Sequence, residues 1–377
     1  MINYLCHVCD KTFPVDAIRY KCECGSPLNL TQSEMCFPIE EIASRDNNLW
    51  RYREALPIAS EASIVSLNEG MTPLVSTSSS VCDHRLKLDF VFPTGSYKDR
   101  GASILLSKAR EAGIREVVED SSGNAGAAIA AYSAKAGIDC TIYCPSTTSS
   151  GKLTQISMYG AKLKLIEGSR AHTTQAVLQA TRTTFYASHN WNPFFLEGTK
   201  TLAFEIAEQL GWKAPDGVIC PVGFGSIYLG LYIGFKQLHD QRVITKIPRL
   251  LGVQSVACCP IYQAYRDNQP QIEKMALEYN TLAEGIISEL PIRSQMIMEA
   301  MNSTDGAFTV VSEEDIEDGI KILARQGIYV EPTSAVVVKA FDHFVQTEVI
   351  RYDDLIVSIL TGSGLKATDK LTKMLSM

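Results

Sequence analysis

Residues 217–230 read Gly-Val-Ile-Cys-Pro-Val-Gly-Phe-Gly-Ser-Ile-Tyr-Leu-Gly. The first six residues form a continuous apolar run, which is typical of a strand buried on both faces of a parallel sheet. Gly223 and Gly225 allow the backbone to turn, and the apolar residues that follow Ser226 predict a helix. A buried strand that passes through a glycine-rich turn into a helix is the repeating unit of an α/β fold.

The same alternation continues on both sides of this stretch. Helix-like patterns lie between short apolar runs, so we expect two α/β domains with parallel or mostly parallel sheets flanked by helices. The apolar runs predict strands at 116–119, 140–144, 163–166, 185–188, 217–222, 250–254, 308–311 and 355–360. The periodic stretches predict helices at 99–112, 123–136, 149–159, 199–210, 226–239 and 313–326. Ser312 is the expected cap of the last helix, with Asp315 three residues on and Gly327 beyond its end.

Composition sets outer limits on the class of protein. The chain has 377 residues, of which 46% are hydrophobic and 20% charged, and this predicts two or three globular domains. A formal net charge of −7 argues against a nucleic-acid partner. No apolar run approaches the roughly 20 residues that span a bilayer, and the first residues lack the pattern of a secretory signal. We therefore expect a cytoplasmic protein with no membrane partner.

Eleven cysteines are present, and four of them cluster near the start of the chain. Cys6-x-x-Cys9 is followed twelve residues later by Cys22-x-Cys24. Four thiolates in two pairs favour a structural zinc, so residues 1–35 are predicted to form a small zinc-ribbon-like module. Reduced cysteines, or a ribbon that has lost its metal, are the alternatives that this spacing leaves open. The remaining cysteines are scattered, which favours reduced thiols over a disulfide framework.

A second informative stretch, residues 93–101, reads Pro-Thr-Gly-Ser-Tyr-Lys-Asp-Arg-Gly. Lys98 follows a Gly/Ser turn and opens a predicted helix. The positive end of the helix dipole disfavours an ammonium group and so favours a neutral amine, which can form an imine with an aldehyde. This segment alone favours a surface lysine at the start of a helix.

A third stretch, residues 120–126, reads Asp-Ser-Ser-Gly-Asn-Ala-Gly between a predicted strand and a predicted helix. The unpaired N–H groups of such a turn can bind a carboxylate, and Asn124 adds a neutral amide. The turn at 223–226 is expected to hold a phosphate in the same way. Tyr228 stands where a dinucleotide fingerprint would have its third glycine, so a nucleotide interpretation is weak.

Taken in this order, the three turns resemble the fold-type II enzymes that use pyridoxal 5′-phosphate (PLP), which have the tryptophan synthase β-like fold. The likeness is closest to the threonine synthase family. That family has Pro-Thr-Gly-Ser-Phe-Lys-Asp-Arg-Gly, where this chain has Tyr97 for the phenylalanine. Its Ser-Thr-Gly-Asn-Thr loop resembles residues 121–125, and its phosphate loop resembles residues 223–226. Its Glu-Pro-x-Ser-Ala and Thr-Gly-x-Gly-Leu-Lys segments resemble residues 331–335 and 361–366. Some members also carry an N-terminal zinc-ribbon-like segment.

The resemblance implies a role for each site residue. Lys98 would hold the cofactor aldehyde as an imine and act as the catalytic base. The further cofactor-binding residues would be Asn124 at the ring 3′-hydroxyl, Gly223, Phe224, Gly225 and Ser226 at the phosphate, and Thr361 at the pyridine nitrogen. The substrate-binding residues would be Ser121, Ser122, Gly123, Ala125 and Lys200. The proposed zinc ligands remain Cys6, Cys9, Cys22 and Cys24.

The resemblance also implies a domain organisation and an oligomeric state. Residues 36–98 and 199–377 would form the large PLP-binding domain, and residues 99–198 a small mobile α/β domain. A homodimer is expected by analogy with the family. The expected partner is a small amino-acid substrate.

Two residues depart from the family pattern. The family loop reads Asn-Ser-x-Asn-Pro-x-Arg-x-x-Gly-Gln-Lys-Thr, and residues 188–201 here read Ser-His-Asn-Trp-Asn-Pro-Phe-Phe-Leu-Glu-Gly-Thr-Lys-Thr. Phe195 replaces an arginine that is expected to meet the substrate phosphate, and a phenyl ring cannot pair with a dianion. Ala125 replaces a threonine. Either another cation (Lys152, Lys200 or Arg170) binds the phosphate, or the substrate differs. His189, in the same loop, is interpreted as a packing or surface residue.

The sequence therefore leads to three functional hypotheses. The first is a threonine-synthase-like lyase that converts O-phosphohomoserine and water into threonine and phosphate. The second is a PLP-dependent β-elimination or β-replacement on serine, threonine or O-phosphoserine, as in ammonia-lyases and in cysteine-synthase-like or cysteate-synthase-like enzymes. The third is a catalytically silent zinc-ribbon binding protein, which the intact Lys98, Asn124 and glycine turn argue against.

Overall fold

The structure is a computed structural model that describes residues 2–15, 19–31, 37–148, 150–168 and 170–375. It divides into two compact units. Unit 1 comprises Met1–Gly70 and Lys98–Thr199, and unit 2 comprises Met71–Tyr97 and Lys200–Met377. The expected domains (1–35, 36–98 with 199–377, and 99–198) stay a prediction beside this division.

Unit 2 is built on a six-stranded sheet with the order β12-β11-β10-β13-β5-β4. All neighbouring strands are parallel except β4, which runs antiparallel to β5 at one edge. The strands are β4 (Leu74–Ser76), β5 (Asp83–Lys87), β10 (Gly217–Pro221), β11 (Arg249–Ser255), β12 (Ala307–Val311) and β13 (Leu355–Ile359). Every residue of β10 is buried, as expected for an apolar strand inside a parallel sheet.

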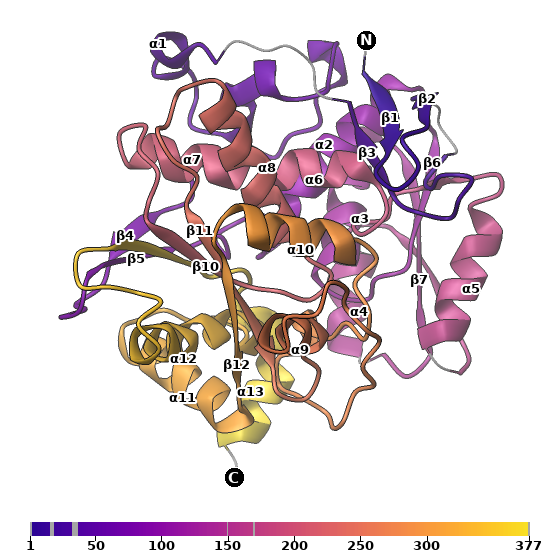
Figure 1. Ribbon diagram of the computed structural model, residues 1–377. Coiled ribbons are helices and arrows are strands. Elements are labelled where there is room, and N and C mark those ends of the chain that lie inside the picture. Colours follow the sequence, from indigo (N-terminus) through magenta and orange to yellow (C-terminus); the bar gives the residue numbers. More distant parts are fainter. Residues whose placement is uncertain (1, 16–18, 32–36, 149, 169, 376–377) are drawn as a thin grey trace. The chain divides into compact units, whose positions relative to one another are not determined.

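Helices cover both faces of this sheet. The long helix α12 (Pro332–Gln346) packs on β10, β11, β12 and β13, whereas α8 (Ser226–Asp240) packs on β10 and β11 from the opposite face (Figure 1). The other helices of unit 2 are α7 (Thr201–Gln209), α9 (Pro260–Arg266), α10 (Ser294–Ser303), α11 (Glu313–Arg325) and α13 (Thr368–Leu375). The apolar side chains between the sheet and α11 and α12 form one core.

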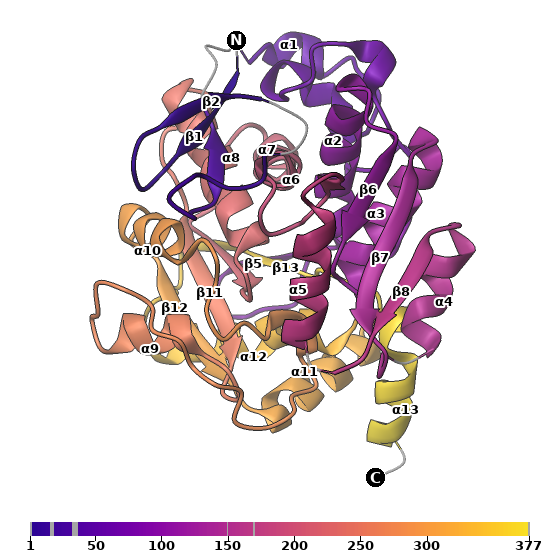
Figure 2. The same ribbon diagram turned by 90° about the vertical axis from the view of Figure 1, so that its right-hand side faces the viewer.

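Unit 1 contains a four-stranded parallel sheet with the order β8-β7-β6-β9. Figure 2 shows β6, β7 and β8 side by side, and Figure 1 shows α3 and α5 on opposite sides of β7. The strands are β6 (Glu116–Glu119), β7 (Asp139–Pro145), β8 (Lys162–Ile166) and β9 (Phe185–Tyr186). The helices are α2 (Lys98–Glu111), α3 (Asn124–Ala136), α4 (Ser150–Met158), α5 (Arg170–Ala180) and α6 (Pro193–Thr199).

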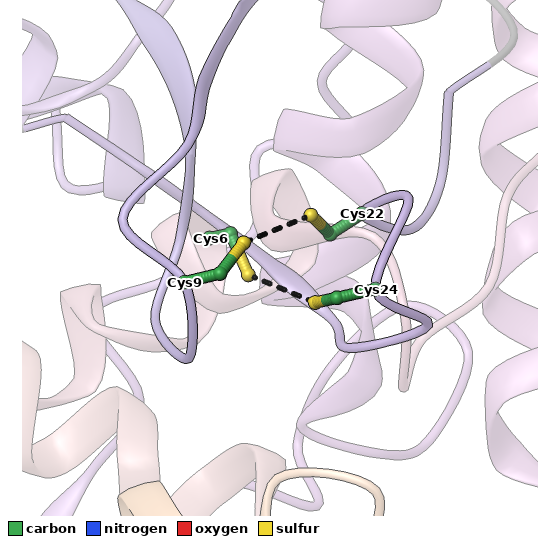
Figure 3. Close-up of side chains that lie close together, drawn as sticks. All are labelled: Cys6, Cys9, Cys22 and Cys24. Carbon is green, nitrogen blue, oxygen red and sulfur yellow. Dashed lines mark hydrogen bonds between the residues drawn. The ribbon is translucent and has the colours of Figure 1, made fainter.

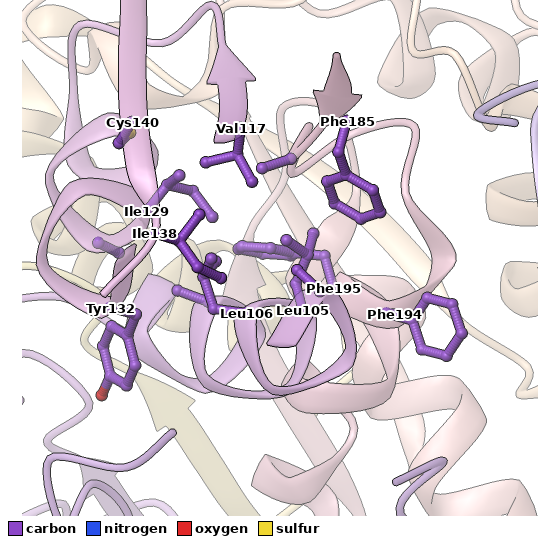
Figure 4. Close-up of a cluster of buried hydrophobic side chains, with 14 of the residues drawn as sticks. Leu105, Leu106, Val117, Ile129, Tyr132, Ile138, Cys140, Phe185, Phe194 and Phe195 are labelled. Atoms are coloured by element: carbon purple, nitrogen blue, oxygen red, sulfur yellow. The ribbon is translucent and has the colours of Figure 1, made fainter. Parts of the chain in front are cut away.

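The start of the chain adds a three-stranded antiparallel sheet to unit 1. Its strands are β1 (Asn3–Cys6), β2 (Thr12–Pro14) and β3 (Leu28–Leu30), in the order β2-β1-β3. Tyr4 packs edge-on against Phe194 of α6, with the ring centroids 6.2 Å apart. The small sheet therefore shares the apolar core of unit 1. Figure 4 shows part of this core, including Phe194. A short helix α1 (Ile39–Ile42) follows.

The predicted strands and helices are confirmed. Each of the eight expected strands is present, with ends shifted by one or two residues, and each expected helix has a counterpart. The cap at Ser312 is also confirmed, because its hydroxyl accepts from the Asp315 N–H at 3.1 Å and the Asp315 carboxylate accepts from the Ser312 N–H at 2.9 Å. Gly327 follows the helix with a φ of +78°, which favours glycine.

Within the described part of the chain, no helix is both long enough and apolar enough to cross a bilayer.

One buried ion pair ties two segments of unit 2 together. The ammonium group of Lys87, at the end of β5, donates to the Glu205 carboxylate of α7 at 2.8 Å, and both side chains are fully buried. Lys87 also donates to the carbonyl of Thr72 at 2.7 Å and to Gln209 at 2.8 Å. The polar groups around this pair are thus hydrogen-bonded, as burial of charge requires.

We predict that Lys87→Met lowers the free energy of unfolding by about 3–5 kcal/mol, because it leaves the Glu205 carboxylate buried without its counter-charge. Urea denaturation measures this change. The double variant Lys87→Met/Glu205→Leu should recover most of the loss. A loss below about 1 kcal/mol in the single variant, the range of a surface ion pair, would show that the pair does not hold these segments.

Candidate active site

The glycine turn of unit 2 lies at the start of α8. Gly225 caps this helix with a φ of +88°, and its lack of a side chain leaves the first helical N–H groups without a side-chain cap. A Cβ atom on Gly223 would lie 2.9 Å from the Ile286 Cα, so only glycine fits between the strand and that segment. The turn therefore presents backbone N–H groups and the positive end of a 15-residue helix, which is a site for a phosphate.

Tyr97 is fixed at this turn from two directions. Its hydroxyl lies 2.9 Å from the hydroxyl of Ser226, the first residue of α8. Its N–H donates to the carbonyl of Thr361 at 2.9 Å, and the Ser363 N–H donates to the Gly95 carbonyl at 2.9 Å. Segments that are far apart in sequence thus meet within unit 2. Lys98 is the next residue, so its Cα atom lies about 3.8 Å from that of Tyr97.

Hydroxyl groups gather beside Tyr97. Ser334 of α12 accepts from the N–H groups of Thr361 and Gly362 at 3.0 and 2.8 Å, and its oxygen lies 3.0 Å from the Thr361 hydroxyl. The Ser96 hydroxyl is fully buried and, among the described residues, has no hydrogen-bond partner. A buried hydroxyl without a partner is rare, and it marks a place where a polar ligand would be accepted.

In unit 1, Lys98 is the first residue of α2. Its ammonium nitrogen lies 5.8 Å from the centre of the Phe195 ring. Phe195 is fully buried and fills the space that the missing side chain of Gly101 leaves on α2. Figure 4 shows Phe195 among the apolar side chains of the core, with Leu105 and Leu106 of α2 nearby. Phe195 is therefore a core residue that an arginine could not replace without burying a charge.

The loop after β6 is the turn that the sequence predicts to bind a carboxylate. Gly123 caps α3, and its N–H donates to the Ser121 hydroxyl at 3.3 Å. The Ser121 carbonyl lies against Gly126, where any side chain would collide with it, so the loop folds back onto the helix. Asp120 is held outside the turn, because it accepts from the Tyr186 hydroxyl at 2.7 Å. Asn124 and Ala125 lie in the first turn of α3.

The strand order of unit 1 supports the prediction that this loop binds a ligand. The chain proceeds from β6 outward to β7 and β8, and then returns to place β9 on the other side of β6. In open parallel sheets, ligands bind outside the carboxyl ends of the strands at the point where the order reverses. The loop after β6 and the loop after β9 both leave the sheet there.

His189, predicted to be a packing or surface residue, follows β9 and lies against a carboxylate. Its Nδ1 atom lies 2.6 Å from the carboxylate of Glu119, the last residue of β6. Glu119 is fully buried and His189 is 9% exposed, so this contact lies in the protein interior. The pairing of β6 with β9, which no spacing rule reveals, is what brings residues 119 and 189 together.

Lys200 and Arg293 are the buried cations of unit 2 near the starts of α7 and α10. Lys200 is 3% exposed, and its ammonium lies 6.0 Å from the Phe204 ring. Burial lowers the pKa of Arg293 to about 9. One helical turn further on, Ile297 packs where a side chain on Gly225 would stand, 2.6 Å from that Cβ position. The side chains of Lys152 and Arg170 lie outside the described part of the chain.

The four N-terminal cysteines converge as predicted (Figure 3). Their sulfur atoms all lie within 4.8 Å of one another, with Cys6 and Cys24 3.5 Å apart and Cys9 and Cys22 3.6 Å apart. Tetrahedral zinc with bonds of about 2.3 Å needs sulfurs roughly 3.8 Å apart. The cluster fits that geometry, and we propose that it holds one structural zinc ion.

In this α/β fold Tyr97 bonds to a glycine turn suited to phosphate and to a segment with a buried hydroxyl cluster, and a lysine follows it in the chain. These features indicate the class of enzymes that bind a phosphorylated aldehyde. The chain belongs to the pyridoxal-phosphate dependent enzymes, since residues 65–362 match that family. Among curated relatives, a threonine synthase of Methanocaldococcus jannaschii is 36% identical over 97% of this chain and 93% of its own length. One from Methanosarcina acetivorans is 32% identical over 97% and 92%.

Solved structures agree on the fold. Maize serine racemase superposes with a TM-score of 0.70 at 21% identity, covering 88% of this chain and 98% of its own. The processed form of threonine deaminase isoform 2 from Solanum lycopersicum gives 0.70 at 19% identity, covering 87% and 94%. The expected fold class is thus confirmed, and PLP is confirmed as the cofactor of the family.

The residues present fit this cofactor. The N-terminus of α8 with Gly223 and Gly225 suits its phosphate, and the buried Ser96 hydroxyl and the Thr361 and Ser334 hydroxyls suit its polar ring. The assignment of Asn124, Phe224 and the other predicted residues to particular cofactor or substrate atoms stays a prediction.

We predict that Gly225→Ala weakens PLP binding about tenfold or more, because a side chain at a φ of +88° strains the turn and meets Ile297. Fluorescence titration of the apoenzyme measures the dissociation constant. Gly327→Ala is the matched control, since Gly327 has a φ of +78° and open space around it. Equal dissociation constants for the Gly225 variant and the wild type would contradict the phosphate turn.

We predict one zinc per chain in protein purified without chelator. Cys9→Ser/Cys24→Ser should lose the metal and lower the unfolding temperature, because two of four ligands are gone. Cys82→Ser, a change of a half-exposed cysteine outside the cluster, should retain one zinc. Metal analysis that finds no zinc in the wild type would reject the site.

Proposed function

We propose that this chain is a PLP-dependent carbon–oxygen lyase that acts on an amino acid, with Lys98 as the residue that holds the cofactor. The observation that carries this proposal is the position of Tyr97, which is bonded to Ser226 at the phosphate turn and to Thr361. The next residue in the chain is Lys98, the first residue of α2. The family match and the long coverage of the threonine synthases support the same assignment.

Each predicted residue has a role in this proposal. Gly223, Phe224, Gly225 and Ser226 would bind the cofactor phosphate, Asn124 its ring hydroxyl, and Thr361 its ring nitrogen. Ser121, Ser122, Gly123 and Ala125 would bind the substrate carboxylate through the turn at the start of α3, with Lys200 as a further cation. A neutral hydroxyl at Thr361 would leave the ring nitrogen unprotonated more often than a carboxylate would.

The first candidate reaction is that of threonine synthase, from O-phosphohomoserine and water to threonine and phosphate. The bound cofactor would withdraw electrons from the substrate carbons next to the amino group. Lys98 would take and return protons at those carbons, and water would add at Cβ after phosphate has left. Relatives of that name at 32–36% identity over 97% of the chain favour this reaction.

The second candidate is β-elimination or β-replacement on serine, threonine or O-phosphoserine. It is favoured by Phe195, which is fully buried against Gly101 and offers a substrate phosphate no charge. Ala125, 2% exposed, likewise offers no hydroxyl group. A fungal L-serine ammonia-lyase is among the structures of the same fold, with a TM-score of 0.68 at 21% identity over 80% of this chain. A homodimer stays a prediction from the family likeness, and a cytoplasmic location stays a prediction from the sequence.

We predict that Lys98→Ala lowers turnover by about 10³-fold or more, because the covalent anchor and the base are lost together. The visible absorbance of lysine-bound cofactor should disappear as well. Lys108→Ala, at the other end of α2 where Lys108 pairs with Glu111 at 2.6 Å, is the control and should keep both. Wild-type turnover in the Lys98 variant would reject the assignment.

A substrate screen separates the two candidates. The holoenzyme is mixed with O-phosphohomoserine, O-phosphoserine, serine and threonine, and the products are identified. We expect threonine and phosphate from O-phosphohomoserine. Release of ammonia and a keto acid from serine or threonine, with O-phosphohomoserine unchanged, would contradict the first candidate and establish the second.

A further inference from the structure

A buried histidine and carboxylate pair stands at the carboxyl edge of the unit 1 sheet. His189 Nδ1 is 2.6 Å from a Glu119 oxygen, which is hydrogen-bond distance. Glu119 is the last residue of β6, and after Asp120 the chain enters the predicted anion-binding turn at residues 121–124. The pair therefore lies at the point of strand-order reversal, where a ligand of this fold is expected.

His189 is also close to the lysine. The Phe195 ring contacts both residues: its centre is 5.8 Å from Lys98 Nζ and 6.0 Å from the centre of the His189 ring, with the two rings nearly perpendicular. The histidine ring and the lysine nitrogen thus lie within about 12 Å of each other. That span is on the order of the length of an extended amino acid with a group on its side chain.

Two changes from the family pattern meet at this place. The pattern Asn-Ser-x-Asn-Pro-x-Arg puts asparagine at position 189 and arginine at position 195, whereas this chain has His189 and Phe195. An arginine binds a phosphate dianion but cannot give up a proton, whereas an imidazole can donate a proton near neutral pH. Compared with the family pattern, this chain lacks the permanent charge at position 195 and has a proton donor at position 189.

We propose that His189, oriented by Glu119, is the general acid that protonates the oxygen leaving group of the substrate. This inference rests on the proposed carbon–oxygen lyase function and adds the group that acts on the oxygen. It also predicts that the site accepts a hydroxyl leaving group. A proton donor allows that group to depart as water, whereas without one it would have to leave as hydroxide.

The step balances on the substrate atoms. Lys98 takes the proton from Cα, and the electron pair of that C–H bond forms a double bond to Cβ. The Cβ–O bond breaks, and its electron pair leaves with the oxygen. That oxygen takes the proton from His189 Nε2, so a hydroxyl group departs as water, and His189 regains a proton from solvent.

Glu119 assigns the two ring nitrogens of His189 to different tasks. A carboxylate at Nδ1 fixes the tautomer with hydrogen on Nδ1 and stabilises the doubly protonated ring, so Nε2 is the nitrogen that exchanges a proton. Glu119 acts through His189 and is a positioning residue. Its burial keeps it ordered at that nitrogen.

The test compares leaving groups in His189→Asn, which restores the residue of the family pattern. β-Chloroalanine is the informative substrate, because chloride leaves without a proton. We expect the variant to lose about 10²–10³-fold in kcat on serine, less on O-phosphoserine, and under about threefold on β-chloroalanine. His343→Asn is the control, since its Nδ1 bonds the Val310 carbonyl at 3.1 Å in the other unit, and it should match the wild type on all three.

Each outcome decides the proposal. An equal loss on all three substrates, or none, would overturn the acid role of His189 while Lys98-dependent elimination by the wild type upheld the function. A wild-type enzyme that cleaves none of the three would overturn the inference, and if it also left O-phosphohomoserine unchanged, the proposed function would fail with it. Glu119→Gln keeps a hydrogen-bond acceptor, so its loss of kcat should depend on the leaving group in the same way but be smaller. An equal loss of kcat on all three substrates would contradict the proposal that Glu119 orients His189.

Discussion

The hydrogen bond between the Tyr97 and Ser226 hydroxyls, 2.9 Å long, is the constraint from which the rest of the site follows. Together with the bond from the Tyr97 N–H to the Thr361 carbonyl, it fixes the segment that precedes α2 at the start of α8. The phosphate turn, the hydroxyls around Ser334 and the residue before the lysine thus belong to one packed unit. The lysine does not depend on a flexible loop for its position, because the residue next to it is bonded through both side chain and backbone.

The glycines near this constraint have separate physical reasons. Gly225 adopts a φ of +88° that side chains disfavour, whereas Gly223 is needed because the Ile286 backbone is 2.9 Å from its Cβ position. Gly101 has neither reason. Its open side is filled by the ring of Phe195. The family segment also ends in a glycine at this position, so Gly101 alone does not account for phenylalanine at position 195.

Much of the fold could be predicted from the sequence because continuous apolar runs mark buried parallel strands. The apolar pattern did not predict β5, because its sequence Asp-His-Arg-Leu-Lys contains only one apolar residue. Its lysine can be buried because Glu205, 118 positions away in the chain, neutralises it. The glycine turns that open α3 and α8 were also predictable, because glycine and serine motifs are local. The Glu119–His189 pair was not, since only the order of β6 and β9 in the sheet brings the two residues together. Arg293 was not predicted as a buried cation, because residues 260–305 are polar and show no regular pattern.

The central claim concerns a single amine, and borohydride reduction tests it most directly. Reduction of the holoenzyme traps the cofactor on the lysine that holds it, and peptide mass spectrometry identifies that lysine. The account predicts the pyridoxyl mark on Lys98 at about one per chain. A mark on any other lysine, or unmarked protein after incubation with PLP, would contradict it.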